Sequence, residues 1–356
     1  MAAQPRADQA PKSPRVNHHG VKTPHPGLKK FDSRDVVATD SQAVPNARIQ
    51  LPRSQPEGRY QIMVQILRAV RQRPLITFLA LAYALSWWPW ILYAFELSPQ
   101  PIVGFGPFLA AVVVLWITRG KTGVVTLLRR MVQWRVRLRW YAIALLLPVA
   151  ISLAAAGLNL LAGAQAPSSI ELSGWTGLLS TFLLLLLVPG IGGAWEEPGW
   201  RGYALPRLQI GRSALSASLI LWAGLVVWHL PLFLVGEIHW SDTVWLFGFV
   251  VIFNWIFNNT GGSVLILMLM HAMNNTISGS FVGPMFSGVD SVRQAWLYTA
   301  LWCAVAIVVV IVARPEHLSR RHRKQEELAD SKPKAEEPPI PLSHNQRRTR
   351  TPRGDS

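Results

Sequence analysis

Long apolar stretches recur along the chain and are separated by short polar segments. A helix needs about 20 mostly apolar residues to cross a bilayer. These stretches lack the alternation of apolar and polar residues that a membrane barrel would require. The pattern therefore predicts an all-α fold, a polytopic membrane bundle of about eight transmembrane helices. The predicted segments run near Leu75–Phe95, Ile102–Thr118, Tyr141–Ala162, Leu178–Trp195, Ala214–Val235, Val244–Phe257, Ser263–Phe281 and Ala295–Ala313.

Both ends of the chain are polar and lie outside the apolar segments. Residues 1–59 are rich in Pro, Gln, Arg, Lys and His, and residues 314–356 are charged and contain no aromatic residue. Such compositions bury too little apolar surface to fold, which predicts disordered basic tails. Residues 60–73 place apolar side chains at helical spacing among arginines, which predicts an amphipathic helix at the membrane interface. Residues 74–313 then form the transmembrane domain.

The basic residues are concentrated in the tails and in a few loops of a chain with formal net charge +16. In a soluble protein this charge would suggest nucleic acid, but here no nucleic-acid partner is expected. Basic loops of membrane proteins stay on the cytoplasmic side, beside anionic lipids. The sequence thus predicts a multi-pass protein of the plasma (inner) membrane with both termini in the cytoplasm. The connection after the second segment is the clearest case, with Arg119, Lys121, Arg129, Arg130, Arg135, Arg137 and Arg139 and no acid.

Two adjacent carboxylates, Glu196 and Glu197, follow the Leu-rich fourth segment, with Arg201 close behind. A charge at the centre of a membrane helix costs at least about 2.5–3.5 kcal/mol, so it is seldom carried without a use. The alternative is that these charges lie at the interface and only neutralise one another. Pro198 should break the helix near the glutamates, with helix resuming toward Gln209, and a hydrated pocket would tolerate that break. Glu197 and Arg201 are four residues apart and suit an ion pair, which leaves Glu196 free for chemistry.

Polar residues also occur within two later apolar segments. His229 has no polar neighbour within three residues, and His271 and Asn275 are four residues apart on one helix face. A packed histidine bonded to a carbonyl, and an asparagine joining helices, are the simpler interpretations. Together with Glu196, however, these groups could activate water and stabilise an oxyanion. Glu196, His229 and His271 could alternatively hold Zn²⁺ with one open position.

The three motifs together resemble the CPBP family, which comprises CAAX prenyl proteases and bacteriocin-processing enzymes and is also described as intramembrane metalloproteases. The likeness covers about residues 73–313. One position departs from the family pattern, because Leu225 stands where phenylalanine usually precedes the histidine by four residues. The motifs are Glu-Glu-x-x-x-Arg at Glu196, Glu197 and Arg201, the histidine His229, and His-x-x-x-Asn at His271 and Asn275.

Carried over position by position, the resemblance implies two groups of site residues. Glu196 would be the water-activating base, supported by Glu197, and His229 would help to hold the water or a metal. His271 and Asn275 would stabilise the oxyanion. Whether such a site uses zinc or glutamate-activated water is open at this point.

The leading hypothesis is an intramembrane endopeptidase, a hydrolase that cuts a peptide or membrane-associated protein near the cytoplasmic membrane face. The alternative is a non-catalytic binding or immunity-type membrane protein that uses the same polar pocket. A proton-coupled transporter ranks last, because the chain shows no paired halves with matching broken segments.

Overall fold

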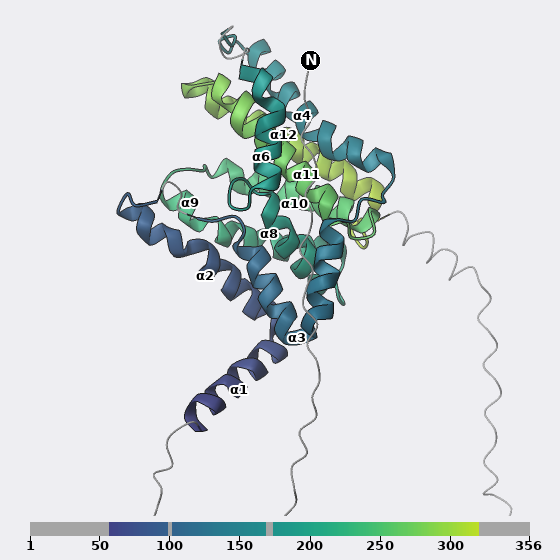
Figure 1. Cartoon of the computed structure of the whole chain (residues 1–356). Helices are drawn as coiled ribbons and strands as arrows, with labels where there is room; N and C mark the ends of the chain where they lie inside the picture. Colours follow the sequence, from purple (N-terminus) through teal and green to yellow (C-terminus); the bar gives the residue numbers. More distant parts are fainter. Residues whose placement is uncertain (1–56, 99–101, 169–173, 320–356) are drawn as a thin grey trace, which may run out of the picture. The chain divides into compact units, whose positions relative to one another are not determined.

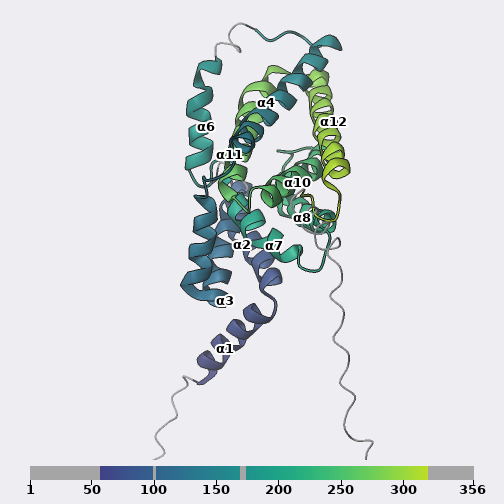
Figure 2. The same ribbon diagram turned by 90° about the vertical axis from the view of Figure 1, so that its right-hand side faces the viewer.

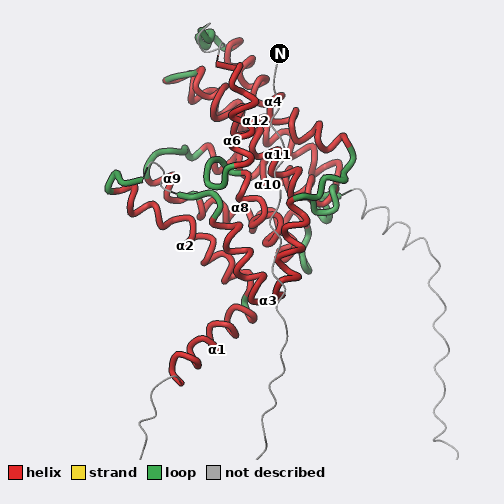
Figure 3. The backbone as a smooth tube through the Cα atoms, in the orientation of Figure 1, coloured by secondary structure: helices red, strands yellow, loops and turns green. Residues whose placement is uncertain are grey.

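The computed structural model describes residues 57–98, 102–168 and 174–319, shown in colour in Figure 1. All of them belong to one compact unit, Gln55–Ser356. Of the expected tails, residues 1–59 and 314–356, the structure describes only 57–59, which are helical, and 314–319, which bond to Ala214 and Asn258. The remaining tail residues lie outside the described residues, as does the other unit, Met1–Ser54. The described chain is helical and has no strand (Figure 3). The predicted helical membrane bundle is therefore confirmed.

Each of the eight predicted apolar segments carries a helix. Two of these helices, α6 (Leu178–Leu187) and α8 (Ala214–Trp228), are short. Within the described ranges, six others are long and apolar enough to cross a membrane: α2 (Pro74–Ala94), α3 (Gly106–Met131), α4 (Leu138–Leu161), α10 (Ser241–Asn259), α11 (Val264–Asn274) continued to Met285, and α12 (Gly288–Ala313).

Several predicted boundaries were wrong, and prolines and a glycine explain most of the differences. The fourth segment ends at Leu187 rather than Trp195, because Val188 precedes Pro189 and takes an extended conformation. The fifth is divided at His229 into α8 and the short α9 (Leu230–Leu234), where Pro231 lacks a backbone donor. The second continues past Thr118 to Met131, with a non-helical break at Gly120.

Helix α11 lies inside the bundle. It contacts α3, α4, α6 and α10, while α10 packs along α12 and α8, and α2 packs along α3. Figure 2 shows α6 and α12 on opposite sides with α10 and α11 between them. The segment after α11 is a π-helix, η4 (Asn275–Val282), followed by a turn, η5 (Gly283–Met285).

The basic loops share one end of the bundle, which we call the basic end. Arg130 Nη1 donates to Gly202 O (3.2 Å), Asn258 Nδ2 donates to His317 O (3.0 Å), and Ala214 N donates to Glu316 O (2.8 Å). These bonds join the last turn of α3 to Gly202, and the end of α10 and the start of α8 to the chain that follows α12.

Acidic residues of other loops lie at the opposite end of the bundle. Tyr93 Oη donates to Glu237 Oε1 (3.2 Å), and Asn159 Nδ2 donates to Asp290 O (3.0 Å). The basic and acidic loops thus lie at different ends of the bundle, whereas the membrane side that each end faces stays a prediction. Helix α1 (Glu57–Gln72) occupies the place of the expected amphipathic helix and exposes Ile62, Met63 and Ile66; its location at the interface also stays a prediction.

Candidate active site

The two glutamates lie on short helical turns that follow the break after α6. Glu196 ends η2 (Ala194–Glu196), and Glu197 precedes a π-helix, η3 (Pro198–Ala204), all of whose residues are buried. Pro198 takes the first position of η3, where a missing backbone donor is harmless. Single π-helical turns are frequent at functional sites. The expected break is present, but it begins eight residues before the expected end of the helix.

Close packing places η3 against the start of α3. A Cβ atom built on Gly199 would overlap the backbone carbonyl carbon of Pro107. The absence of a side chain at Gly199 therefore allows the two elements to touch. This contact fixes the position of the turn that carries the glutamates.

Glu197 joins two of the three sequence motifs through one oxygen. Its Oε1 accepts hydrogen bonds from Arg201 Nη1 (3.1 Å) and from His271 Nδ1 (2.7 Å). Glu197 is fully buried and Arg201 is 1% exposed, so both charges are removed from solvent. The guanidinium also lies over the rings of Phe249 (5.8 Å) and Phe253 (5.0 Å), which favours the positive charge. The predicted ion pair is confirmed, whereas the bond to His271 was not predicted.

The hydrogen bonds of the two histidines determine which nitrogen faces the site. His229 Nδ1 donates to Leu225 O (2.8 Å), so its neutral ring has an acceptor at Nε2. The acceptor is the backbone carbonyl of Leu225. The side chain of Leu225 takes no part in this bond, although the family pattern has phenylalanine at this position. His271 Nδ1 donates to the Glu197 carboxylate, and its Nε2 lies against Gly193, where a Cβ atom would overlap it.

A cavity of about 450 Å³ brings the motifs together. Four of the six predicted site residues line it, and Glu197 and Arg201 lie behind the wall. Within the described chain, the Glu196 carboxylate makes no hydrogen bond, so it is free to bind a proton donor. The four lining residues are Glu196, His229, His271 and Asn275.

Asn275 is positioned by its neighbour. Asn274 Nδ2 donates to Asn275 Oδ1 (3.3 Å), and Tyr298 Oη donates to Asn274 Oδ1 (2.6 Å). The carbonyl oxygen of Asn275 is thereby occupied, and its amide N–H groups remain for an acceptor.

Sequence reasoning missed three groups of this cavity. Glu237 and Trp245 line it, and Gly193 makes room for the imidazole. Long-range packing places these residues, and no local pattern in the sequence could have indicated them.

The cavity is built at the end of the bundle opposite to the basic loops. Ile102 and Gly104 reach it from the chain before α3, and Glu237 reaches it from the loop between α9 and α10. The buried η3 lies between the glutamates and Gly202, which Arg130 contacts at the basic end. A cytoplasmic basic end and cleavage near the cytoplasmic face were both expected, and this geometry does not favour both at once.

The three residues that the sequence offered as zinc ligands do not form a compact group. Glu196, His229 and His271 line the same cavity, yet nowhere in residues 57–98, 102–168 and 174–319 are three His, Cys, Asp or Glu side chains grouped closely enough to hold a metal ion. The donor set as arranged does not fit a metal. A zinc requirement stays a prediction.

Comparison with known proteins identifies a related domain over these motifs. Residues 175–277, which include all six predicted site residues, match the family described as Type II CAAX prenyl endopeptidase Rce1-like. A protein of Methanococcus maripaludis named CAAX prenyl protease 2 is 24% identical over 120 residues, which are 30% of this chain and 44% of that protein. The chain therefore matches less than half the length of this curated relative.

Proposed function

We propose that this multi-pass membrane protein, a member of the CPBP family through its Rce1-like CAAX endopeptidase segment 175–277, is an intramembrane endopeptidase. The observation that carries the proposal is the cavity in which a free carboxylate, two imidazoles and an amide meet. These groups come from three separate stretches of the chain. A structural role for them would not require that they share a cavity.

Glu196 is the general base in this proposal. Its carboxylate removes one proton from a water molecule, while His229 Nε2 accepts a hydrogen bond from the remaining O–H group of that water. The water oxygen bonds to the carbonyl carbon of the peptide, and a tetrahedral oxyanion forms. When the carbon–nitrogen bond breaks, the proton held by Glu196 passes to the leaving amine. No metal takes part in these steps.

Asn275 and His271 stabilise the oxyanion. The free amide N–H groups of Asn275 donate directly. His271 donates from Nε2 only as an imidazolium, because its Nδ1 hydrogen is bound to Glu197. The Glu197 carboxylate binds the Nδ1 side of this ring, and Arg201 holds the same carboxylate oxygen in place.

The proposed substrate is a peptide or a membrane-associated protein that reaches the cavity at the end opposite to the basic loops. The Methanococcus maripaludis relative is named CAAX prenyl protease 2. Prenylated peptides and plain peptides are therefore the two classes to compare.

The test is peptide cleavage by the purified full-length protein in detergent. Wild type, Glu196→Gln and the control Glu96→Gln would be assayed on a panel of quenched peptides, prenylated and plain, without any ion gradient. Glu96 is an exposed carboxylate that does not line the cavity. We expect wild type and Glu96→Gln to cleave, and Glu196→Gln to lose activity while remaining folded.

Two results would overturn parts of the proposal. Absence of cleavage by folded wild type on every peptide, with and without added metals, would favour the non-catalytic binding or immunity-type protein. One metal ion per chain that is lost together with activity on chelation would replace direct water activation with zinc chemistry.

A further inference from the structure

Three arginines line a second, smaller cavity at the basic end. Arg119, Arg130 and Arg207 surround a space of about 120 Å³ whose other walls are mostly apolar or glycine. Arg119 is close enough to repel both other guanidinium groups. None of the three forms a salt bridge with any described carboxylate. Like charges gathered without a counter-charge are unfavourable, and a bound anion would relieve the repulsion.

Two of the arginines are held in place by backbone oxygens. Arg207 Nη1 donates to Tyr203 O (2.8 Å), and its guanidinium lies 3.7 Å from the centre of the Tyr203 ring. Arg130 Nη1 donates to Gly202 O (3.2 Å). A guanidinium has five N–H donors, so each keeps several for a ligand. Such fixed forks match the geometry of phosphate oxygens.

The break in α3 brings the third arginine to this cavity. Gly120 has φ 60° and ψ −156°, a conformation that is essentially restricted to glycine. The chain then resumes as helix, and a Cβ atom on Gly123 would lie only 2.7 Å from Arg119 Cβ. The two glycines thus allow Arg119 to lie beside the following helical turn.

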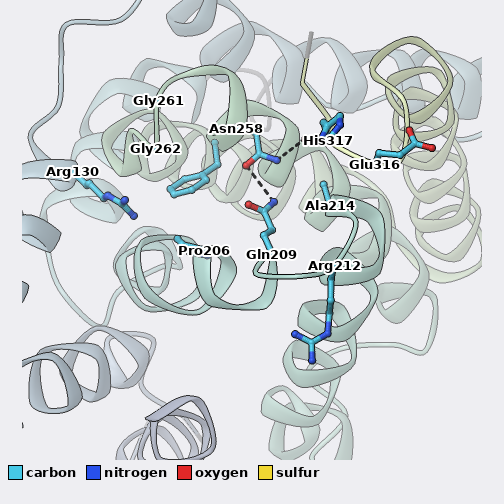
Figure 4. A pocket seen from close by; sticks show the side chains of 11 residues that line it. Arg130, Pro206, Gln209, Arg212, Ala214, Asn258, Gly261, Gly262, Glu316 and His317 are labelled. Atoms are coloured by element: carbon cyan, nitrogen blue, oxygen red, sulfur yellow. Dashed lines mark hydrogen bonds between the residues drawn. The ribbon is translucent and has the colours of Figure 1, made fainter. Parts of the chain in front are cut away.

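A larger polar cavity of about 400 Å³ shares Arg130 with the cavity of the three arginines. Figure 4 shows the Arg130 side chain reaching between Pro206 and the Gly261–Gly262 turn, with Glu316 on the far side. Gln209 and Asn258 on its floor are bonded to each other (3.2 Å). The single carboxylate that lines this neighbouring cavity, that of Glu316, lies across the cavity from Arg130.

We propose that Arg119, Arg130 and Arg207 form a binding site for a phosphate group, supplied by the head group of an anionic membrane lipid. A site for a whole small molecule usually measures roughly 300–1,000 Å³, so this cavity suits a phosphate whose remaining molecule lies outside. Its position is that of a lipid head group. Arg71 of α1 contacts Ile117 O (3.4 Å) nearby, and Trp116 is 61% exposed one turn before the cavity. Exposed Trp is typical of the membrane–water interface.

The experiment measures lipid binding by the full-length protein, so its outcome is independent of protease activity. Native mass spectrometry and thermal unfolding would follow titration with phosphatidylglycerol and, separately, phosphatidylcholine. Arg119→Gln/Arg130→Gln/Arg207→Gln is compared with Arg129→Gln, which removes an exposed charge from the same helix without touching the cavity. Arg207→Gln alone is the second variant, in case the triple variant does not fold.

We expect wild type and Arg129→Gln to bind phosphatidylglycerol saturably and in preference to phosphatidylcholine. The triple variant should bind it about tenfold more weakly, and Arg207→Gln should be intermediate. Inorganic phosphate and glycerol phosphate are titrated in parallel. Stabilisation by these soluble anions at concentrations similar to the lipid's would overturn the lipid source. Equal lipid binding by Arg129→Gln and the cavity variants would overturn the site.

Discussion

At the scale of single residues, one buried carboxylate oxygen of Glu197 holds two other side chains of the site. Glu197 Oε1 accepts from both Arg201 and His271, so the ion pair and the imidazole share one acceptor. Arg201→Met should leave the Glu197 carboxylate buried without its cation. Breaking such a pair from one side costs about 3–5 kcal/mol. We expect a lower unfolding temperature in detergent and loss of cleavage.

The double variant Glu197→Gln/Arg201→Met separates stability from activity. Replacing both charges removes the unpaired carboxylate, so much of the lost stability should return. Cleavage should not return, because His271 has lost the carboxylate that holds its ring through Nδ1. Recovery of both properties in the double variant would show that Glu197 is only a partner of Arg201.

A second prediction at this scale concerns the space beside His271. A Cβ atom on Gly193 would overlap His271 Nε2. Gly193→Ala should therefore displace the imidazole and abolish cleavage, while far-ultraviolet circular dichroism stays that of wild type. Gly177→Ala is the control, since its Cβ would meet only Ser180 Oγ at 3.8 Å. Normal cleavage by Gly193→Ala would argue against a role for His271 in the reaction.

The sequence could indicate which side chains take part, but not all of their partners. Polar residues in apolar segments are costly, which is why the motifs were recognisable from composition and spacing. The i,i+4 pair of Glu197 and Arg201 is local and was predicted. The bond from Glu197 to His271 spans 74 positions and depends on how α11 packs against η3. No local pattern encodes that distance.

At the scale of elements, the contact between η3 and α3 determines where the glutamates lie. Gly199→Ala would force a Cβ atom into the backbone of Pro107. Overpacking of this kind costs about 1–3 kcal/mol. We expect a lower unfolding temperature and reduced cleavage, because the two elements must move apart.

Gly157→Ala in α4 is the matched control for this contact. No atom outside its own helix surroundings lies within 4 Å of its Cβ position. Alanine is also the better helix former, so stability should be equal or slightly higher. Similar unfolding temperatures for Gly199→Ala and wild type would show that the two elements do not pack as described.

Hydrophobic runs predicted the existence of the elements better than their ends. Val188 leaves the helix because Pro189 follows it, although the predicted apolar segment continued to Trp195. Conversely, α3 continues as helix through polar residues after Gly120, where apolar periodicity alone indicated a loop. Proline and glycine chemistry explains both, but a glycine within a helix does not reveal its own conformation.

For the whole molecule, the decisive question is which side of the membrane the cavity faces. The basic loops share one end, and the cavity is lined from the other by Gly104 and Glu237. The positive-inside rule places the basic end in the cytoplasm. With that orientation the cavity would open away from the cytoplasm, contrary to the expectation of cleavage near the cytoplasmic face.

Cysteine labelling in intact cells measures this directly. The single Cys303 is replaced by serine, and Glu237→Cys and Arg129→Cys are introduced separately at exposed positions of the two ends. A membrane-impermeant maleimide should label Glu237→Cys in intact cells and Arg129→Cys only after permeabilisation. The reverse pattern would place the cavity on the cytoplasmic side and would make this chain an exception to the positive-inside rule. Either pattern decides from which compartment the substrates to be tested must come.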